Sequence, residues 1–214
     1  MIIAIDGPAG AGKSTVAKLV AKQLGLTFLD TGAMYRAVTL EVLARGVDPE
    51  DAAACARIAA SLKLEFDAQG KIHLDGRPGE PAIRSSAVTR AVSAVSAHAA
   101  VREHIVAQQQ RIAASSRGVV AEGRDTTTVV FPRADHKFFV TASSNERARR
   151  RALELHTPEA EAQIRADIER RDRLDSTRAV SPLVKALDAL EIVTDGKSID
   201  DVTRELLAAI GATP

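Results

Sequence analysis

The spacing of apolar residues along the chain predicts an alternation of strands and helices. Residues 2–6 form a short apolar run that ends at a glycine-rich turn, which is typical of a buried strand. In residues 13–24 the apolar side chains recur three and four positions apart, which predicts an amphipathic helix. The chain is therefore expected to open with a strand, a glycine-rich loop and a helix.

Further apolar runs predict the remaining strands, and alanine-rich or periodic segments predict the remaining helices. Strands are expected at 27–29, 118–121, 137–140 and 191–193. Helical segments are expected at about 32–44, 49–62, 86–115, 145–178 and 198–209. Two of the apolar runs, 118–121 and 137–140, have no polar face, which is typical of a parallel sheet covered on both faces. Strands that alternate with helices in this way predict an α/β fold.

Between residues 63 and 85 the pattern changes. Short strand-like pieces at 64–66, 71–74 and 82–83 are separated by glycines and prolines. This texture predicts a small antiparallel insert that lies between helical segments.

Composition and charge exclude several classes of function. Of the 214 residues, 45% are hydrophobic and 27% are charged, which is an ordinary balance for a folded domain. The net charge of +1 gives no bulk attraction to nucleic acid or to an anionic membrane, and the 3% of aromatic residues argues against a base-stacking surface. The single cysteine excludes an intramolecular disulfide and a multi-cysteine zinc site. No apolar run approaches the roughly 20 residues that cross a bilayer, and the first residues do not resemble a signal peptide, so we expect a cytosolic protein.

Residues 7–14, Gly-Pro-Ala-Gly-Ala-Gly-Lys-Ser, match the phosphate-loop pattern G-x-x-x-x-G-K-[ST] between a predicted strand and a predicted helix. Its glycines let successive backbone N–H groups point into one concavity, and the helix adds the positive end of its dipole. Lys13 can then reach the β- and γ-phosphates of a nucleotide, while the Ser14 hydroxyl can bind Mg²⁺. The candidate nucleotide-binding residues are Gly7, Pro8, Ala9, Gly10, Ala11, Gly12, Lys13, Ser14 and Thr15.

The phosphate loop alone does not choose between a kinase, a GTPase and a mechanical ATPase. Glu122 ends the apolar run of a predicted strand, where its carboxylate can hold Mg²⁺ together with Ser14; the alternative is a solvated acid at a strand end. The guanine-binding pattern N-K-x-D is absent, and the chain is short. These features favour a small-molecule kinase, which positions an acceptor and neutralises the charge on the transferred phosphoryl group.

Four further segments carry polar residues that a bare fold does not need. They are D-T-G-A-M-Y-R-A at 30–37, S-A-V-S at 93–96 with V-R at 101–102, G-R-D at 123–125, and R-D-x-x-D-S-x-R at 171–178. In this order, from residue 2 to about 195, the chain resembles the bacterial cytidylate kinases (CMP/dCMP kinases) among the P-loop nucleoside monophosphate kinases. The resemblance implies that MgATP phosphorylates CMP and dCMP to CDP and dCDP by direct in-line transfer.

The same resemblance implies a single domain over residues 1–214 with three parts. A parallel β-sheet core flanked by helices would comprise 1–62, 86–145 and 179–214. The insert at about 63–85 would be an NMP-binding subdomain, and a helical lid would cover about 146–178.

Several charged residues acquire roles through this resemblance. Arg36, Arg124 and Arg178 would hold the acceptor phosphate, for which the planar guanidinium fork is well suited. Arg171 and Asp175 would contact the pentose and the phosphates. The alternatives are a solvated helix face for these charges and a local ion pair between Arg124 and its neighbour.

Three residues would read the cytosine edge. Asp125 or Ser93 would accept from the N4 amine, and Arg102 would donate to O2 and N3. Uracil reverses this pattern and would leave buried groups unpaired. Alternatively, Ser93 is an ordinary helix residue, and Arg102 pairs with Glu103 or with a neighbouring element. Thr127 stands where the family usually has glycine, so we expect it to stiffen or reshape the loop behind Asp125.

The segment 146–178 is rich in arginines and acids. Its arginines are expected on the surface of two helical turns, one with Arg147, Arg150 and Arg151 and the other with Arg170, Arg171 and Arg173. In the family this lid excludes water and supplies donors to the transferring phosphoryl group. We expect Arg150 and Arg171, with Lys13, to have this catalytic role.

Two alternatives remain open at this point. One is a P-loop kinase for UMP or another small acceptor, and the other is a binding module that holds ATP without turnover. The expected partners are ATP and CMP or dCMP, with no nucleic acid and no membrane, and we expect a monomer.

Overall fold

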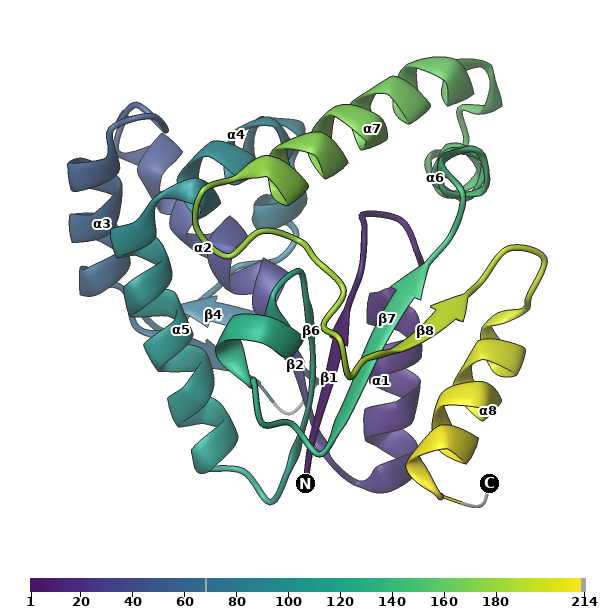
Figure 1. The fold of residues 1–214 in the computed structure, drawn as a ribbon. Helices are drawn as coiled ribbons and strands as arrows, with labels where there is room; N and C mark the ends of the chain where they lie inside the picture. Colours follow the sequence, from purple (N-terminus) through teal and green to yellow (C-terminus); the bar gives the residue numbers. More distant parts are fainter. Residues whose placement is uncertain (68, 213–214) are drawn as a thin grey trace. The chain divides into compact units, whose positions relative to one another are not determined.

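The apolar runs of the sequence become the strands of a five-stranded sheet (Figure 1). The computed structural model describes residues 1–67 and 69–212. The sheet has the order β2-β6-β1-β7-β8, with β1 (Ile2–Asp6), β2 (Thr27–Asp30), β6 (Val119–Gly123), β7 (His136–Thr141) and β8 (Leu190–Val193). β1 pairs in parallel with both β6 and β7, and β7 pairs in parallel with β8. The predicted α/β fold with a parallel sheet is confirmed.

The chain divides into two compact units, one of Met1–Phe28 with Arg117–Pro214 and the other of Leu29–Ser116. The first unit contains α1 (Lys13–Leu24), the helical turn η2 (Thr126–Val130), α6 (Ser144–Leu155), η3 (Pro158–Ala160), α7 (Glu161–Thr177) and α8 (Ile199–Ile210). The second contains α2 (Thr31–Ala44), α3 (Ala52–Ser61), β3 (Leu64–Phe66), β4 (Ile72–Leu74), β5 (Arg77–Pro78), η1 (Ala82–Arg84), α4 (Ser86–Ala97) and α5 (Ala99–Ala114). The predicted single domain with an insert and a lid stays a prediction.

The core of the first unit lies between the sheet and two helices, α1 and α8, which lie side by side in Figure 1. Val16 and Val20 of α1 are one helical turn apart and pack with Ile3 and Ile5 of β1, all at most 2% exposed. Helix α8 contributes buried leucines to the same cluster. This packing fixes the strand and the helix that flank the phosphate loop.

The second unit contains a small sheet whose strands pair antiparallel in the order β3-β4-β5. The predicted strand at 64–66 is confirmed, as is most of the one at 71–74. The strand-like reading of 82–83 was wrong, because Pro81 begins a helical turn in which Arg84 N donates to Pro81 O at 2.9 Å. The third strand is β5 instead.

Two long helical segments of the sequence each prove to be two helices. His98 has an extended backbone with ψ 121° and separates α4 from α5. His156 has a left-handed backbone with φ 56° and ends α6, so η3 and α7 follow in a new direction. The turn η2, directly after Asp125, was not expected from the sequence.

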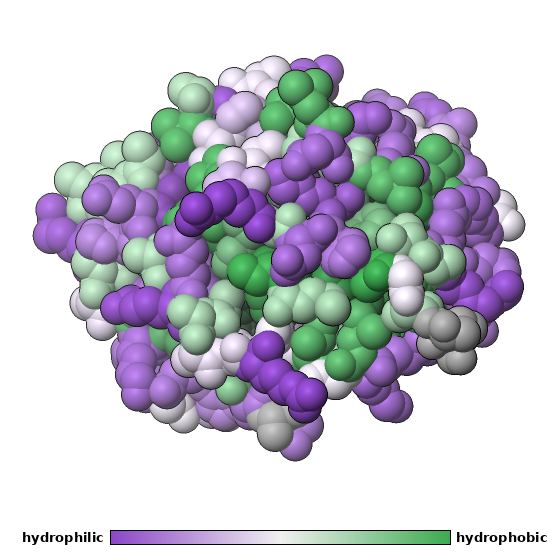
Figure 2. All heavy atoms as spheres, turned by 60° about the horizontal axis from the view of Figure 1, so that its bottom comes forward, coloured by the Kyte–Doolittle hydropathy of each residue, from purple (hydrophilic) through white to green (hydrophobic). Residues whose placement is uncertain are grey.

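The surface combines hydrophilic and apolar side chains. On the face shown in Figure 2, apolar side chains gather toward the middle and hydrophilic ones cover most of the margin. Exposed apolar residues of the first unit include Leu187, Leu190 and Val193, in and just before the edge strand β8. Among the helices of residues 1–67 and 69–212, none has the length and apolar character needed to cross a membrane.

Candidate active site

The phosphate loop joins β1 to α1 as the sequence predicted. Gly7 has φ 149°, and a Cβ at this position would lie 1.9 Å from the carbonyl oxygen of Val140, so only glycine fits. Gly12 precedes α1 in the left-handed conformation with φ 88° and has no side chain to cap the helix. The first amides of α1 are thus directed by the backbone alone, in the arrangement that binds anions at helix N-termini.

Lys13, the first residue of α1, is 4% exposed, and its Nζ donates to the carbonyl oxygen of Pro8 at 2.7 Å. Burial lowers the pKa of Lys13 to about 7, and the positive charge of Arg124 acts in the same direction. The carboxylates of Glu122 and Asp6 partly oppose this shift. The loop therefore holds an ammonium group whose charge is costly until an anion approaches it.

Ser14 and Glu122 come together although they lie in different elements. The Ser14 hydroxyl donates to Glu122 Oε1 at 2.7 Å, and Glu122 is 5% exposed at the end of β6. A hydroxyl and a carboxylate are oxygen ligands of the kind that Mg²⁺ takes, and Mg²⁺ usually binds few protein groups because it keeps waters and phosphate oxygens. The pair therefore fits a magnesium ion that a nucleotide brings. Thr15, the next residue, is exposed.

A second group of charged residues follows directly on β6. Arg124 Nε donates to Asp175 Oδ2 at 3.0 Å, and Arg178 Nη2 lies 3.8 Å from Asp125 Oδ1. Asp125 and Asp175 are 3% and 5% exposed. Both ion pairs join the residues that follow β6 to the end of α7. Two arginines and two carboxylates, nearly removed from water, form a polar cluster that a bare fold does not require.

Arg147 was expected on the surface of the lid, and that prediction was wrong. The side chain is buried, with Nε donating to Ala142 O and Nη1 donating to Ala9 O, each at 3.0 Å. Arg147 also pairs with Asp172 of α7, whose Oδ1 accepts from Ala9 N at 3.3 Å. Arg147 of α6 and Asp172 of α7 thus both bind Ala9 of the phosphate loop. The sequence analysis had assigned neither residue such a role.

The two arginines chosen as catalytic both lie near the loop. Arg150 donates from Nη1 to Thr194 Oγ1 at 2.9 Å, and Nη1 lies 3.9 Å from the position a Cβ would take at Gly12. The charge of Arg171 contributes to lowering the pKa of Lys13. Their roles in the transfer step stay predictions.

In the second unit, Arg36 contacts a residue that the sequence analysis missed. Arg36 Nη1 donates to Thr89 Oγ1 at 2.9 Å and to Ile83 O at 3.2 Å. Thr89 precedes Ser93 by four residues on α4, so the two hydroxyl side chains share one face of this helix. That spacing was the only signal for Thr89 in the sequence.

Arg102 is 3% exposed. Its Nη1 donates to the carbonyl oxygen of Ser96 at 3.0 Å, and its guanidinium lies 4.9 Å from the centre of the Tyr35 ring. This cation–π stacking leaves the planar group in a fixed orientation. Tyr35 lies in the segment 30–37 that the sequence analysis singled out, but no role was assigned to it there.

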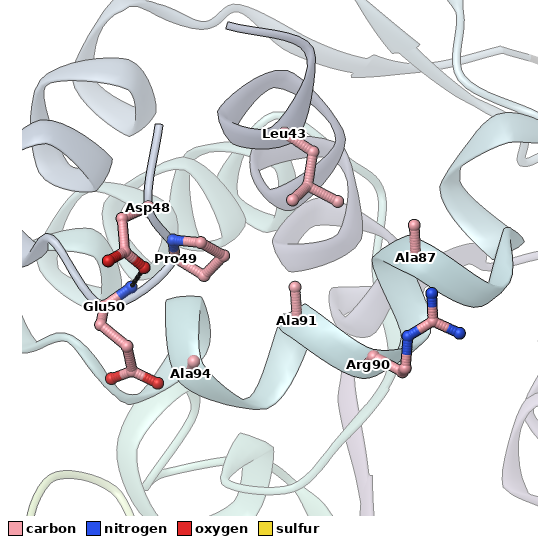
Figure 3. Close-up of a pocket in the computed structure, with 8 residues that line it drawn as sticks. All are labelled: Leu43, Asp48, Pro49, Glu50, Ala87, Arg90, Ala91 and Ala94. Carbon is pink, nitrogen blue, oxygen red and sulfur yellow. Dashed lines mark hydrogen bonds between the residues drawn. The ribbon is translucent and has the colours of Figure 1, made fainter. Parts of the chain in front are cut away.

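A cavity of about 410 Å³ lies in the second unit, and Figure 3 shows the residues that line it. Leu43, the loop at 48–50 and one face of α4 form its walls, with alanines at 87, 91 and 94. None of the residues predicted to bind a nucleotide lines this cavity. Ser93 lies on another face of α4, so the cavity is separate from the contacts described above.

Comparisons with known proteins agree with this geometry. A family model described as cytidylate kinase matches residues 3–212. A "Bifunctional pantoate ligase/cytidylate kinase" of Synechococcus sp. (strain CC9311) is 52% identical over 94% of this chain and 42% of its own length. A protein of the same description from Prochlorococcus marinus (strain MIT 9303) is 50% identical over 96% of this chain and 44% of its own length. The chain thus spans less than half the length of these curated relatives.

A solved structure shows the same fold. A gluconokinase from Sinorhizobium meliloti 1021 superposes with a TM-score of 0.51, over 98% of this chain and 90% of that one. The two sequences are 15% identical, so this likeness concerns the fold alone.

Proposed function

The chain belongs to the cytidylate kinase family, and from this premise we propose that it transfers the γ-phosphoryl group of MgATP to CMP or dCMP. The products are ADP and CDP or dCDP. The observation that carries the proposal is the end of β6, where Glu122, Arg124 and Asp125 follow one another in four residues. Glu122 accepts from Ser14 of the phosphate loop, while Arg124 and Asp125 belong to the buried polar cluster. One short segment thereby serves both the triphosphate and the acceptor.

The phosphate loop binds the ATP phosphates through its backbone amides, and Lys13 neutralises charge on the β- and γ-phosphates. Ser14 and Glu122 would hold a magnesium ion, which would supply positive charge beside the phosphates. Arg150 and Arg171 donate to the transferring group. Electrostatic stabilisation of this kind supplies most of the rate in phosphoryl transfer.

On the acceptor side, Arg124 and Arg178 bind the monophosphate, and Asp175 accepts from a pentose hydroxyl. Asp125 accepts from the cytosine N4 amine. In the second unit we assign the roles implied by the family to three residues, with Arg36 on phosphate and Ser93 and Arg102 on the base. The fixed orientation of Arg102 over Tyr35 supports a part in base recognition.

The reaction needs no covalent intermediate on the protein. An ionised oxygen of the acceptor phosphate forms a bond to the γ-phosphorus, and the bond from that phosphorus to the β–γ bridging oxygen breaks. The electron pair leaves with ADP. Because the acceptor phosphate is already ionised at neutral pH, no side chain has to act as a general base.

An initial-rate panel tests the proposal. The purified protein is given MgATP with CMP, dCMP, UMP, AMP or GMP, and ADP formation is followed in a coupled assay. We expect rates that strongly favour CMP and dCMP, and no ADP without a monophosphate. Near-background rates with all five acceptors would contradict the proposal and leave a nucleotide-binding protein. A preference for UMP would identify a related kinase of different specificity.

The magnesium site gives an independent prediction. Glu122→Gln removes a negative charge and a good oxygen ligand beside Ser14, so the Mg²⁺ concentration for half-maximal rate is expected to rise by about 10-fold. The measurement is a Mg²⁺ titration of the CMP kinase rate at fixed ATP. Glu205→Gln, on α8, changes a partly exposed acid that pairs with Lys197; it is the control and should leave the titration unchanged. An unchanged Mg²⁺ requirement in the Glu122 variant would remove this residue from the metal site.

A further inference from the structure

Asp6 is a buried carboxylate to which neither the motif nor the reaction assigns a role. It ends β1, is 0% exposed and directly precedes Gly7 of the phosphate loop. Four donors meet it, two from each of two consecutive threonines. Oδ1 accepts from the backbone N and the hydroxyl of Thr126 at 2.8 and 2.7 Å, and Oδ2 accepts from the same groups of Thr127 at 2.7 and 2.6 Å.

These contacts join the beginning of the phosphate loop to the turn that follows Asp125. Thr126 and Thr127 are the first residues of η2, so the Asp6 carboxylate caps this turn at its N-terminus. Val129 N and Val130 N both donate to the backbone oxygen of Asp125, at 2.9 and 3.1 Å. A rotation of η2 would therefore rotate the backbone of Asp125.

Asp6 is itself held in place from two sides. In the sheet it pairs in register with Gly123, and the next residue, Gly7, packs directly against the backbone of Val140. Burial raises the pKa of Asp6, and the four hydrogen bonds oppose this shift. Thr127 is 1% exposed, so its hydroxyl has no water as a substitute partner.

We propose that Asp6 and Thr127 are positioning residues, which hold Asp125 at the angle needed to distinguish cytosine from uracil. The inference rests on the proposed function. Asp6 is held in place by the sheet, and the Thr127 hydroxyl donates to it. This hydrogen bond fixes the position of η2, and η2 in turn orients Asp125. Thr127 thus acts on the base through Asp125 and does not touch it. The sequence analysis expected Thr127 to stiffen this loop, and the hydrogen bond from its hydroxyl to Asp6 is the contact that would do so.

Thr127→Val tests this because valine keeps the shape and the β-branch of threonine but lacks the hydroxyl. We expect the KM for CMP to rise by about 10-fold, and the ratio of kcat/KM for CMP to that for UMP to fall by about the same factor. The KM for ATP should change less than twofold. Thr127→Ser restores the hydroxyl and should restore the ratio. Asp6→Asn is the more obvious variant, but a side-chain amide cannot accept from four donors, so we expect that variant to be too unstable for this test.

Thr203→Val is the matched control, since Thr203 is a buried threonine of the same unit whose hydroxyl donates to Ile199 O at 2.8 Å within α8. It should lower the melting temperature without changing the KM for CMP or the CMP to UMP ratio of kcat/KM. In an Asp125→Ala background, Thr127→Val should leave the CMP to UMP ratio unchanged, because the residue through which it acts is gone.

The outcomes separate the inference from the proposed function. If the wild-type protein does not prefer CMP, the proposed function fails. If the wild type prefers CMP but Thr127→Val lowers only the melting temperature, as Thr203→Val does, the hydroxyl is structural and the inference is overturned. A further fall of the ratio in the Asp125→Ala background would equally overturn it, because Thr127 would then act by another route.

Discussion

Lys13→Met is expected to lower kcat/KM for MgATP by about 10³-fold while raising the melting temperature of the nucleotide-free protein. The loss of activity follows from removing the cation that neutralises the β- and γ-phosphates in the transition state. The gain in stability follows from burial, because methionine fills the same space without bringing a charge out of water. The two effects have opposite signs, as expected where a functional group is costly to the fold.

The pH dependence of the stability gain has a definite sign. Because the folded protein lowers the pKa of Lys13 from 10.5 to about 7, the unfolded chain binds more protons between these pH values. The destabilising effect of Lys13 is therefore complete below pH 7 and fades as pH rises toward 10.5. The melting-temperature difference between Lys13→Met and wild type should be greatest near pH 6.5, roughly 5 °C, and smaller at pH 9.

Thermal unfolding at the two pH values and steady-state kinetics measure both effects. Lys22→Met, an exposed lysine in the last turn of α1, is the control and should change neither property appreciably. A Lys13→Met variant that is less stable than wild type at pH 6.5 would show that the buried Lys13 does not destabilise the fold. A kcat/KM for MgATP within tenfold of the wild-type value would show that Lys13 has no major part in phosphoryl transfer.

The parts of the fold that the sequence predicted well depend on local patterns. The bounds of β1 and α1 agree with the predicted segments because apolar spacing and the glycine loop act within a few residues. The pairing of Ser14 with Glu122 could be predicted from the sequence for a related reason. Glu122 lies at the carboxyl end of β6 and Ser14 follows the carboxyl end of the adjacent parallel strand β1, and such ends meet at one edge of a sheet.

The contacts that the sequence did not predict join residues far apart in the chain. Arg147 belongs to a run of mixed charge, and such a run is usually a solvated helix face, yet its guanidinium is buried against Ala9. Asp6 and Thr127 are separated by 121 positions, and neither residue type indicates the other as its partner. Periodicity shows which face of an element is buried, but it does not show which polar group on another element will satisfy a buried one.

Asp125→Ala is expected to abolish most of the discrimination between cytosine and uracil. The carboxylate accepts from the cytosine N4 amine, whereas uracil presents an oxygen at the same place. We therefore expect kcat/KM for CMP to fall by about 10²-fold and that for UMP to fall much less. Asp125→Asn should give an intermediate result, because a side-chain amide can accept from N4 in one orientation and donate to the uracil O4 in the other.

The same rate panel, run on wild type and both variants, measures this effect. Asp200→Ala removes an exposed acid from the first turn of α8 and is the control, with an unchanged CMP to UMP ratio expected. Asp125 also faces Arg178 at 3.8 Å, so its removal alters the charge near the acceptor phosphate. That phosphate is the same in CMP and UMP. Equal losses for both acceptors would therefore assign Asp125 to the phosphate through Arg178, whereas a collapse of the ratio assigns it to the base.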